Sequence, residues 1–392
     1  MALDVRSLDY KPIQLDDREI RLLEIQMGRD INDPVVSRMV NVKVTRDLEF
    51  IGLCALLRDS DDNDTEHIWV NASRVTVSKT LGQALRHVRA LFLREKASLY
   101  QTSSNDSSSS GTQPSSPPSP RRASSSKTKK PPAWLRQVLR GFRSILPDES
   151  NPAARQVPLR VWLDCICVNL RDPAEAEQRR AHLTLAYESA KITVGWLGLK
   201  DETSDMGINT LRRLETLFPP NFGHPQDKID HPENYSPIMQ WLAPFGPVCA
   251  EDVKVNGGAD KGPLYMAIMS FANRPFFKRQ WIVEELTLSA FPAFLLGDEI
   301  ISWQQMLQWN RTDIEFEKAG AQGICKEFLE AIRVMPKMDI AVVFTLLDAY
   351  DRRRGRYIAR DLMNMTPSSS LSTNNSYGEP PPRPNTSRAD GK

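Results

Sequence analysis

The chain has 392 residues, of which 40% are hydrophobic and 26% are charged, and its mean hydropathy is -0.42. Its net charge of +2 excludes binding to nucleic acid through overall charge, and no apolar run approaches the roughly 18 residues of a membrane span. The acidic N-terminus lacks the apolar core of a signal peptide, and the number of cysteines, 5, is odd. We therefore expect a cytoplasmic protein with reduced thiols and no disulfide framework.

The N-terminal part predicts strands followed by a helix. Four segments rich in β-branched and aliphatic residues predict strands, at 18–26, 35–44, 67–71 and 74–78. A helix follows, capped by Ser78 or Thr80, with one apolar face.

Composition then changes abruptly. Residues 101–132 are rich in Ser and Pro, offer little to bury, and predict a disordered insert. Residues 134–146 predict a basic amphipathic helix. Such a helix either docks on its own domain, which we favour, or binds an anionic membrane.

The central part predicts a strand–helix–strand unit. Val161–Val168 is an apolar run that we expect to form an interior strand, and Ile192–Leu197 is expected to be its neighbour. Between them lies a helix with Pro173 and acidic residues in its first turn and Lys191 at its far end, which complements the helix dipole. Two strands joined by a helix imply parallel pairing. We therefore expect an α/β fold with a mostly parallel central sheet flanked by helices.

The C-terminal part predicts a long loop at 218–262, a helix, a loop at Asn273–Pro275, a helix from about Lys278, a strand at 293–297 and a short helix opened by Ser302. Residues 325–363 look helical, and the tail is rich in Ser, Asn and Pro. The expected organisation is a domain at 1–310, a helical extension at 311–363 and a disordered tail at 364–392.

Two groups of residues are candidates for a site. Asp164 lies inside the apolar run, where a carboxylate is costly unless it caps the backbone or serves a site, and Asn169 follows at the end where ligands bind in parallel sheets. The second group surrounds a helix start with positive charge, an aromatic ring and a carboxylate: Arg274, Arg279, Trp281 and Glu285. Such a set holds a ribose and phosphates, or forms a surface ion-pair network.

Several chemistries are not expected. Cys165 and Cys167 are separated by one residue, but no further Cys or His stands at metal-ligand spacing, so we expect no metal site. The chain has no phosphate-binding glycine loop, no G-x-S-x-G elbow and no H-E-x-x-H helix.

Three segments carry a resemblance to a known family. VWLDCICVNLRD, AYESAKITVGWLG and RPFFKRQWIVEELTLS strongly resemble, in order, motifs of the fungal heterokaryon-incompatibility (HET) domain. Those motifs are W-I-D-A-I-C-I-N-Q-x-D, a helix ending I-Y-x-x-A with the strand V-x-W-L-G, and R-P-W-F-x-R-x-W-x-x-Q-E. The resemblance covers roughly Arg18 to Leu307, and it adds Trp196, the tryptophan of V-x-W-L-G, to the ligand-binding candidates.

The chain also departs from the family pattern. The opening motif Y-x-A-L-S-Y-x-W-G aligns with FIGLCALLR, in which Cys54, Ala55, Leu57 and Arg58 replace Ser, Tyr, Trp and Gly. Leu170 and Glu284 each stand where the family has Gln. A pocket that needs those groups is therefore altered here.

The resemblance implies both a fold and a function. HET domains are distantly similar to Toll/interleukin-receptor (TIR) domains, so a TIR-like, flavodoxin-like fold is implied, and Trp281 and Glu285 align with the TIR pattern W-C-x-x-E-L. The implied function is non-self recognition that leads to growth arrest or programmed cell death in fungi. Self-association and binding to other incompatibility or NLR-type proteins are implied, without nucleic acid.

Two alternatives remain open at this point. One is an enzyme that cleaves NAD as its substrate, with Glu285 as the catalytic carboxylate, and the other is a degenerate regulator that does not signal. No resident cofactor is expected in either case.

Overall fold

The computed structural model describes part of the chain, namely residues 4–5, 8–26, 28, 30–55, 64–105, 135, 159–219, 221–235, 263–279, 285–318 and 342–353. The expected insert, basic helix and tail lie outside these residues, apart from 101–105, which end a helix, and Leu135, which is buried. Met1–Tyr350 forms one compact unit and Asp351–Lys392 a second.

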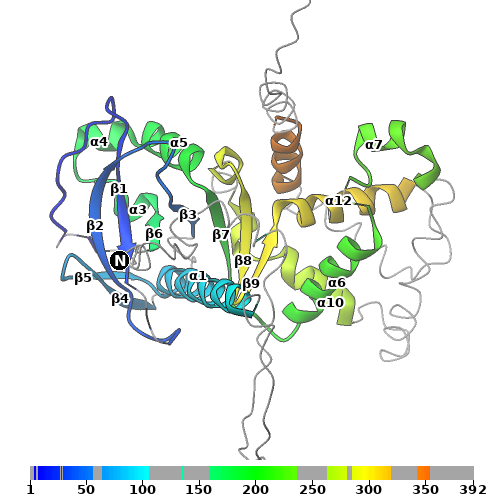
Figure 1. Cartoon of the computed structure of the whole chain (residues 1–392), viewed down its shortest axis with the longest axis horizontal. Coiled ribbons are helices and arrows are strands. Elements are labelled where there is room, and N and C mark those ends of the chain that lie inside the picture. Colours follow the sequence, from blue (N-terminus) through cyan, green and yellow to red (C-terminus); the bar gives the residue numbers. More distant parts are fainter. Residues whose placement is uncertain are drawn as a thin grey trace, which may run out of the picture. The chain divides into compact units, whose positions relative to one another are not determined.

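A nine-stranded sheet runs through the first unit in the order β5-β4-β2-β1-β6-β3-β7-β8-β9 (Figure 1). Its strands are β1 Glu19–Ile25, β2 Val36–Lys43, β3 Ile51–Cys54, β4 Thr65–Val70, β5 Ser73–Ser78, β6 Leu159–Trp162, β7 Ile192–Gly198, β8 Pro292–Leu296 and β9 Glu299–Ser302. The four strands expected in the first eighty residues are all present, whereas β3 and β9 were not expected. Because β9 follows β8 after a two-residue turn that contains Gly297, which has a positive φ, the two strands form a hairpin.

The sheet is mixed, so the expectation of a mostly parallel sheet is wrong. Parallel pairing joins β6 to β3, β3 to β7, β7 to β8, and β2 to β4. Antiparallel pairing joins β1 to β2, β1 to β6, β4 to β5, and β8 to β9, and more residues pair in this way. The strand–helix–strand unit correctly predicts the parallel centre. It carries no information about the hairpins that extend the sheet on both sides.

The segment expected to be one strand, Val161–Val168, is a strand that turns into a helix. β6 ends at Trp162, and a single helical turn, α3 Asp164–Cys167, follows. All four residues of the turn are buried, whereas a strand would send alternate side chains to opposite faces. The backbone of this turn is also bonded from outside, since the Tyr10 hydroxyl donates to the Ile166 carbonyl at 2.9 Å and Arg21 donates to the Cys167 carbonyl at 3.2 Å.

β7 is not the direct neighbour of β6, as the sequence suggested, because β3 lies between them. All four residues of β3 are buried, and Gly52 faces Trp162 on one side and Thr193 on the other. A methyl group at Gly52 would lie 2.9 Å from the Tyr187 ring and 2.9 Å from the Thr193 hydroxyl. The small residue therefore allows a helix to pack closely on the central strands.

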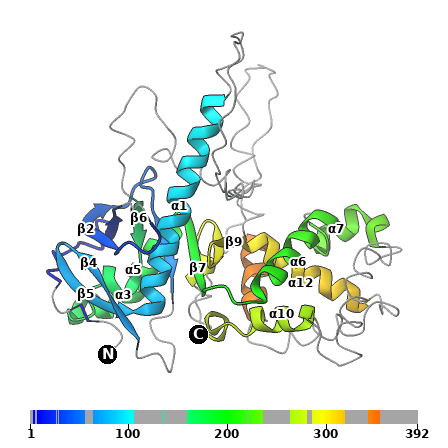
Figure 2. The same ribbon diagram turned by 90° about the horizontal axis from the view of Figure 1, so that it is seen from below.

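Helices cover both faces of the sheet. α1 (Lys79–Asn105) begins where the Leu81 amide donates to the Ser78 hydroxyl at 3.2 Å, as expected from the sequence, and it lies along the sheet against β4, β5 and β7 (Figure 2). α5 (Arg179–Ser189), preceded by α4 (Pro173–Glu177), packs on the other face, where Tyr187 meets Trp162 edge-on at 4.9 Å.

A group of helices continues the unit beyond β9 (Figures 1 and 2). They are α6 Ser204–Leu217, α7 Pro225–Asp230, the 3-10 helix η2 Pro232–Tyr235, α10 Pro263–Ala272, the 3-10 helix η4 Pro275–Lys278 and α12 Trp303–Lys318. Ser302 opens α12 as expected: its hydroxyl accepts from the Gln305 amide at 3.1 Å, and its own amide donates to the Gln305 side chain at 2.8 Å. Within the described ranges, no helix is both long enough and apolar enough to span a bilayer.

The hairpin between β4 and β5 carries local backbone strain. Its two turn residues, Asn71 and Ala72, have φ values of 52° and 65°, which a two-residue type I′ turn requires. Asn tolerates this conformation, but an alanine in it costs roughly 1 kcal/mol because its Cβ crowds the backbone. Glycine is the residue that this turn prefers at the second position.

We expect Ala72→Gly to stabilise the protein by up to about 1 kcal/mol, because the relief of strain exceeds the entropy gained by the unfolded chain. Urea unfolding measures the change. Ala181→Gly, the same replacement at an exposed position in α5, should instead cost roughly 1 kcal/mol. Equal losses in both variants would contradict the strained turn.

Candidate functional site

Asp164 is the first residue of the α3 turn, directly beyond the carboxyl end of β6. It is 8% exposed, and Arg179, the first residue of α5, donates to its carboxylate in an ion pair. A buried carboxylate is costly unless it is paired, and Arg179 provides that pairing from a side chain that stays 38% exposed. The ion pair therefore lies at the boundary between core and solvent.

Cys54 and Tyr187 lie next to this ion pair. Cys54 ends β3, Tyr187 lies two turns after Arg179 on α5, and their side chains share a hydrogen bond. Burial raises the pKa of the Cys54 thiol most, and the charges of Glu285 and Asp164 raise it further. The pKa of the Tyr187 hydroxyl is also raised, first by burial and then by Cys54, Glu285 and Asp164. Both groups are therefore uncharged at neutral pH.

Glu285 approaches the same place from another element. It is the first described residue of a helical stretch that includes residues 285–288, and it is 9% exposed. The next residue, Leu286, packs against Gly195 of β7, where an added methyl group would lie 3.2 Å from the leucine side chain. Asp164 and Glu285 thus act on the same three groups, namely Cys54, Tyr187 and Arg179. The structure brings the two predicted carboxylates together.

This cluster, which we call the acidic cluster, consists of Cys54, Asp164, Arg179, Tyr187 and Glu285. One atom of the cluster, the Arg179 Nε, is buried without a hydrogen-bond partner, and so is the hydroxyl of the fully buried Thr193 beside Tyr187. A buried polar atom without a partner costs free energy unless water or a ligand satisfies it. A polar ligand with hydroxyl groups can donate hydrogen bonds to the carboxylates of Asp164 and Glu285. It can also accept hydrogen bonds from the donors that lack a partner.

Arg274 bonds within the fold through both terminal nitrogens of its guanidinium, whereas its buried Nε has no hydrogen-bond partner among the described residues. Its guanidinium donates to the carbonyls of Leu197 at 3.0 Å and Leu199 at 2.8 Å, to the Ser204 hydroxyl at 2.9 Å, and to the Asp201 carboxylate at 3.1 Å. These contacts tie the segment after β7 to the end of α10. The Arg274 guanidinium, which the sequence suggested as a ligand-binding group, thus binds backbone carbonyls and side chains at and after the end of β7.

The remaining predicted residues lie elsewhere. Trp196 points to the α1 face, where it stacks on His87 at 5.0 Å, whereas its neighbour Gly195 faces Phe276 on the opposite side of β7. Arg279 is half-buried at the end of η4, and Trp281 and Glu284 lie outside the described residues. Within the part of the chain that is described, three or more groups able to hold a metal ion do not cluster anywhere.

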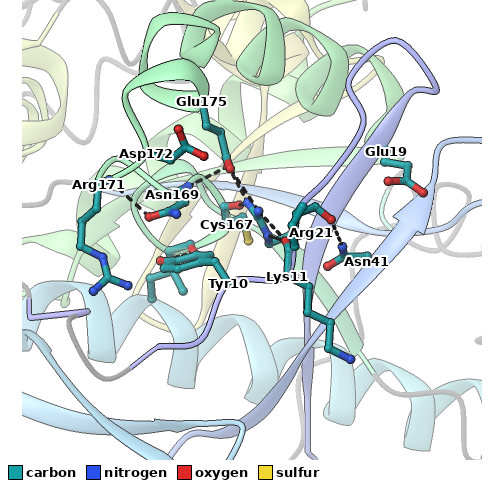
Figure 3. Close-up of polar contacts among 12 residues, drawn as sticks. Tyr10, Lys11, Glu19, Arg21, Asn41, Cys167, Asn169, Arg171, Asp172 and Glu175 are labelled. Carbon is teal, nitrogen blue, oxygen red and sulfur yellow. Dashed lines mark hydrogen bonds and ion pairs between the residues drawn. The ribbon is translucent and has the colours of Figure 1, made fainter.

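Asn169 belongs to a second cluster on the other side of the α3 turn (Figure 3). Its amide donates to Glu175 at 2.8 Å, and its side chain accepts from the Arg171 amide at 3.3 Å. Glu175 also forms a buried ion pair with Arg21, at 2.5 Å and 3.1 Å. Figure 3 shows Arg21 and Asn169 both directed at the Glu175 carboxylate, with Tyr10 beside them.

The sequence reasoning did not select Arg179, Tyr187, Arg21 or Glu175. Two signals were available. Arg179 and Tyr187 are eight residues apart on a helix and so share a face, and Arg21 places a charge inside an apolar strand, as Asp164 does.

The fold and the acidic cluster define a class of protein: a mixed α/β protein with buried carboxylates where its central parallel strands end. Residues 151–285 match the family model described as Heterokaryon incompatibility protein (HET). This segment therefore belongs to the heterokaryon-incompatibility family, and it contains both Asp164 and Glu285. Searches of curated proteins and of solved structures gave no match. The implied similarity to TIR domains remains a prediction.

Because of the buried thiols, we expect the free energy of unfolding to change with pH in the alkaline range. Burial raises the pKa of Cys167 to about 12 from 9.0, so above pH 9 the unfolded chain releases a proton that the folded chain keeps. This contribution to stability is complete below pH 9 and is lost as the pH rises to about 12. The loss is at most about 1.4 kcal/mol per pH unit for each such group.

We therefore expect the free energy of unfolding to fall between about pH 9 and pH 10.5, and to fall less steeply in Cys167→Ala, by up to about 1.4 kcal/mol per pH unit. Urea unfolding at a series of pH values measures the slope. Identical slopes for the variant and the wild type would show that Cys167 titrates in the folded protein as it does in the unfolded chain.

Proposed function

We propose that this protein acts in heterokaryon incompatibility as an intracellular module of non-self recognition, whose activation leads to growth arrest or programmed cell death in fungi. The observation that carries the proposal is the family match at residues 151–285, which spans both carboxylates of the acidic cluster. Partners of this module are a second copy of the chain and other incompatibility or NLR-type proteins. The site of action is the cytoplasm.

The acidic cluster favours a second candidate, an enzyme that cleaves the glycosidic bond of NAD. Water would replace nicotinamide at the ribose, so that the carbon–nitrogen bond breaks and ADP-ribose is released. Such a reaction passes through an oxocarbenium-like transition state, which a carboxylate stabilises. Glu285 is the candidate for this role, and the buried position that it shares with Asp164 is the observation that supports it.

The first test is controlled expression in a fungal host. Wild-type protein should arrest growth, whereas Glu285→Gln and Asp164→Asn should restore it, because each removes one buried charge from the acidic cluster at nearly constant volume. Glu188→Gln, at an exposed position on α5, is the matched control and should still arrest growth. Melting temperatures of the purified variants would reveal loss of fold. Full arrest by both cluster variants would sink the proposed role of the carboxylates.

The second candidate needs an assay in vitro. Purified wild-type protein is incubated with NAD and the products are separated by chromatography. If the enzyme reading holds, Glu285→Gln should lower the rate by roughly 10²- to 10³-fold, the usual effect of removing one group that stabilises a transition state. Growth arrest without NAD loss would leave the signalling function and eliminate the enzyme.

A further inference from the structure

Arg21 makes more contacts than an ion pair needs. It lies in β1, is 1% exposed, and uses all three of its guanidinium nitrogens. Nε and Nη2 donate to the Lys11 carbonyl at 3.1 Å and 2.7 Å, and Nη1 donates to the Cys167 carbonyl at 3.2 Å. Nη1 and Nη2 also bind the two oxygens of Glu175. One side chain therefore joins four segments of the chain.

Glu175 links Arg21 to the loop after α3. Its Oε1 accepts both from Arg21 and from the Asn169 amide, at 2.5 Å and 2.8 Å. The loop is therefore held at Cys167 by Arg21 directly, and at Asn169 through Glu175 (Figure 3). Asp164 is the first residue of the α3 turn, and this loop follows the last residue of the same turn.

The N-terminal segment, residues 8–12, also contacts the α3 turn and the arginines around it. The Tyr10 ring lies between two guanidinium groups, 5.0 Å from Arg21 and 5.7 Å from Arg171, and its hydroxyl donates to the Ile166 carbonyl. Arg171 in turn donates to the Leu8 carbonyl at 2.9 Å. The segment thus clasps the α3 turn by contacts with its backbone.

The α3 turn needs these outside contacts. It has only four residues, and its own backbone bonds are three: the Ile166 and Cys167 amides donate to the Leu163 carbonyl, and the Val168 amide donates to the Asp164 carbonyl. A single helical turn is unstable alone, because few hydrogen bonds offset the entropy of fixing its backbone. Its position is therefore set by the partners of its carbonyls, which are Tyr10 for Ile166 and Arg21 for Cys167.

We propose that Arg21 is a positioning residue for the acidic cluster: by holding the α3 turn at its carboxyl end, it fixes where Asp164 presents its carboxylate to Arg179 and Glu285. This inference rests on the proposed function, since it assumes that the acidic cluster is the working site. Residues 8–12 then form part of the frame of the site, although none of them belongs to the acidic cluster.

A purely structural ion pair would behave differently. If Arg21 merely stabilised the core, its loss would loosen all parts of the unit together. If it positions the turn, its loss frees the turn first. The turn carries its own reporters, because Cys165 and Cys167 are buried within it, whereas Cys54, the cysteine of the acidic cluster, is buried in β3.

The test is thiol labelling of the native full-length protein with iodoacetamide, with each cysteine followed by mass spectrometry. Arg21→Lys keeps the charge but loses the fork that reaches Lys11, Cys167 and Glu175 together. Cys165 and Cys167 should then react faster by about tenfold or more, the factor that follows from losing a charge-assisted hydrogen bond, while Cys54 stays protected. Arg38→Lys, which alters the ion pair between the exposed Arg38 on β2 and Glu24 on β1, is the matched control and should change none of the rates.

Two outcomes overturn the proposal: equal acceleration of all three cysteines, or unchanged rates at Cys165 and Cys167. If Arg21→Lys does not fold, Tyr10→Phe decides the matter, because it removes only the hydroxyl that holds the Ile166 carbonyl. It should accelerate the same two cysteines to a smaller extent.

The labelling result does not depend on any biological activity. In the fungal growth assay, Arg21→Lys should weaken arrest, with a melting temperature that still shows a folded protein. Wild-type protein that arrests nothing would defeat the proposed function while the labelling still decides the geometry. Normal arrest by a variant with freed cysteines would show that the position of the turn does not matter to function, and would overturn the positioning role.

Discussion

The polar groups that are buried just after the end of β6 need hydrogen-bond or ion-pair partners, and the elements that supply these partners are held together by them. The chain leaves the sheet at Trp162, turns once, and buries a carboxylate and two backbone carbonyls within six residues. Their partners come from β1, from the N-terminal segment and from α5, which are elements far apart in the sequence. Two ion pairs result, one on each side of the turn: Arg179–Asp164 joins α5 to the turn, and Arg21–Glu175 joins α4 to β1.

The central strands are the part of the fold that sequence reasoning predicts well. Largely apolar runs at β1, β7 and β8 indicate buried strands, and the helix between β6 and β7 correctly implies parallel direction. The place of β3 in the sheet could not be predicted, because a strand of four apolar residues does not indicate which two strands it will pair with. The α3 turn was missed for a related reason: its residues are apolar enough for a strand, and only the distant donors Tyr10 and Arg21 favour the helical turn.

The site was predicted in part. Asp164 and Glu285 could be chosen because a carboxylate in an apolar context needs a reason to be there, and the structure places them around the same three groups. Trp196 lies apart from these groups, because its neighbour Gly195, and not Trp196, faces the side of the sheet on which Glu285 lies. The contacts of Arg274 could not be predicted either, because a cluster of charge in the sequence does not reveal that its guanidinium donates to the carbonyls of Leu197 and Leu199.

The position of β6 between β1 and β3 has a consequence for synthesis of the chain. β1 and β2 can pair as a hairpin as soon as they emerge from the ribosome, but the other edge of β1 finds its partner only when residues 159–162 have been made. β3 waits equally long for β6 and longer for β7. Contacts at such sequence separation slow folding, and open strand edges invite pairing with other chains. More than a hundred residues of synthesis therefore separate the first hairpin from a complete sheet, an interval in which the open strand edges of the nascent chain are exposed to aggregation.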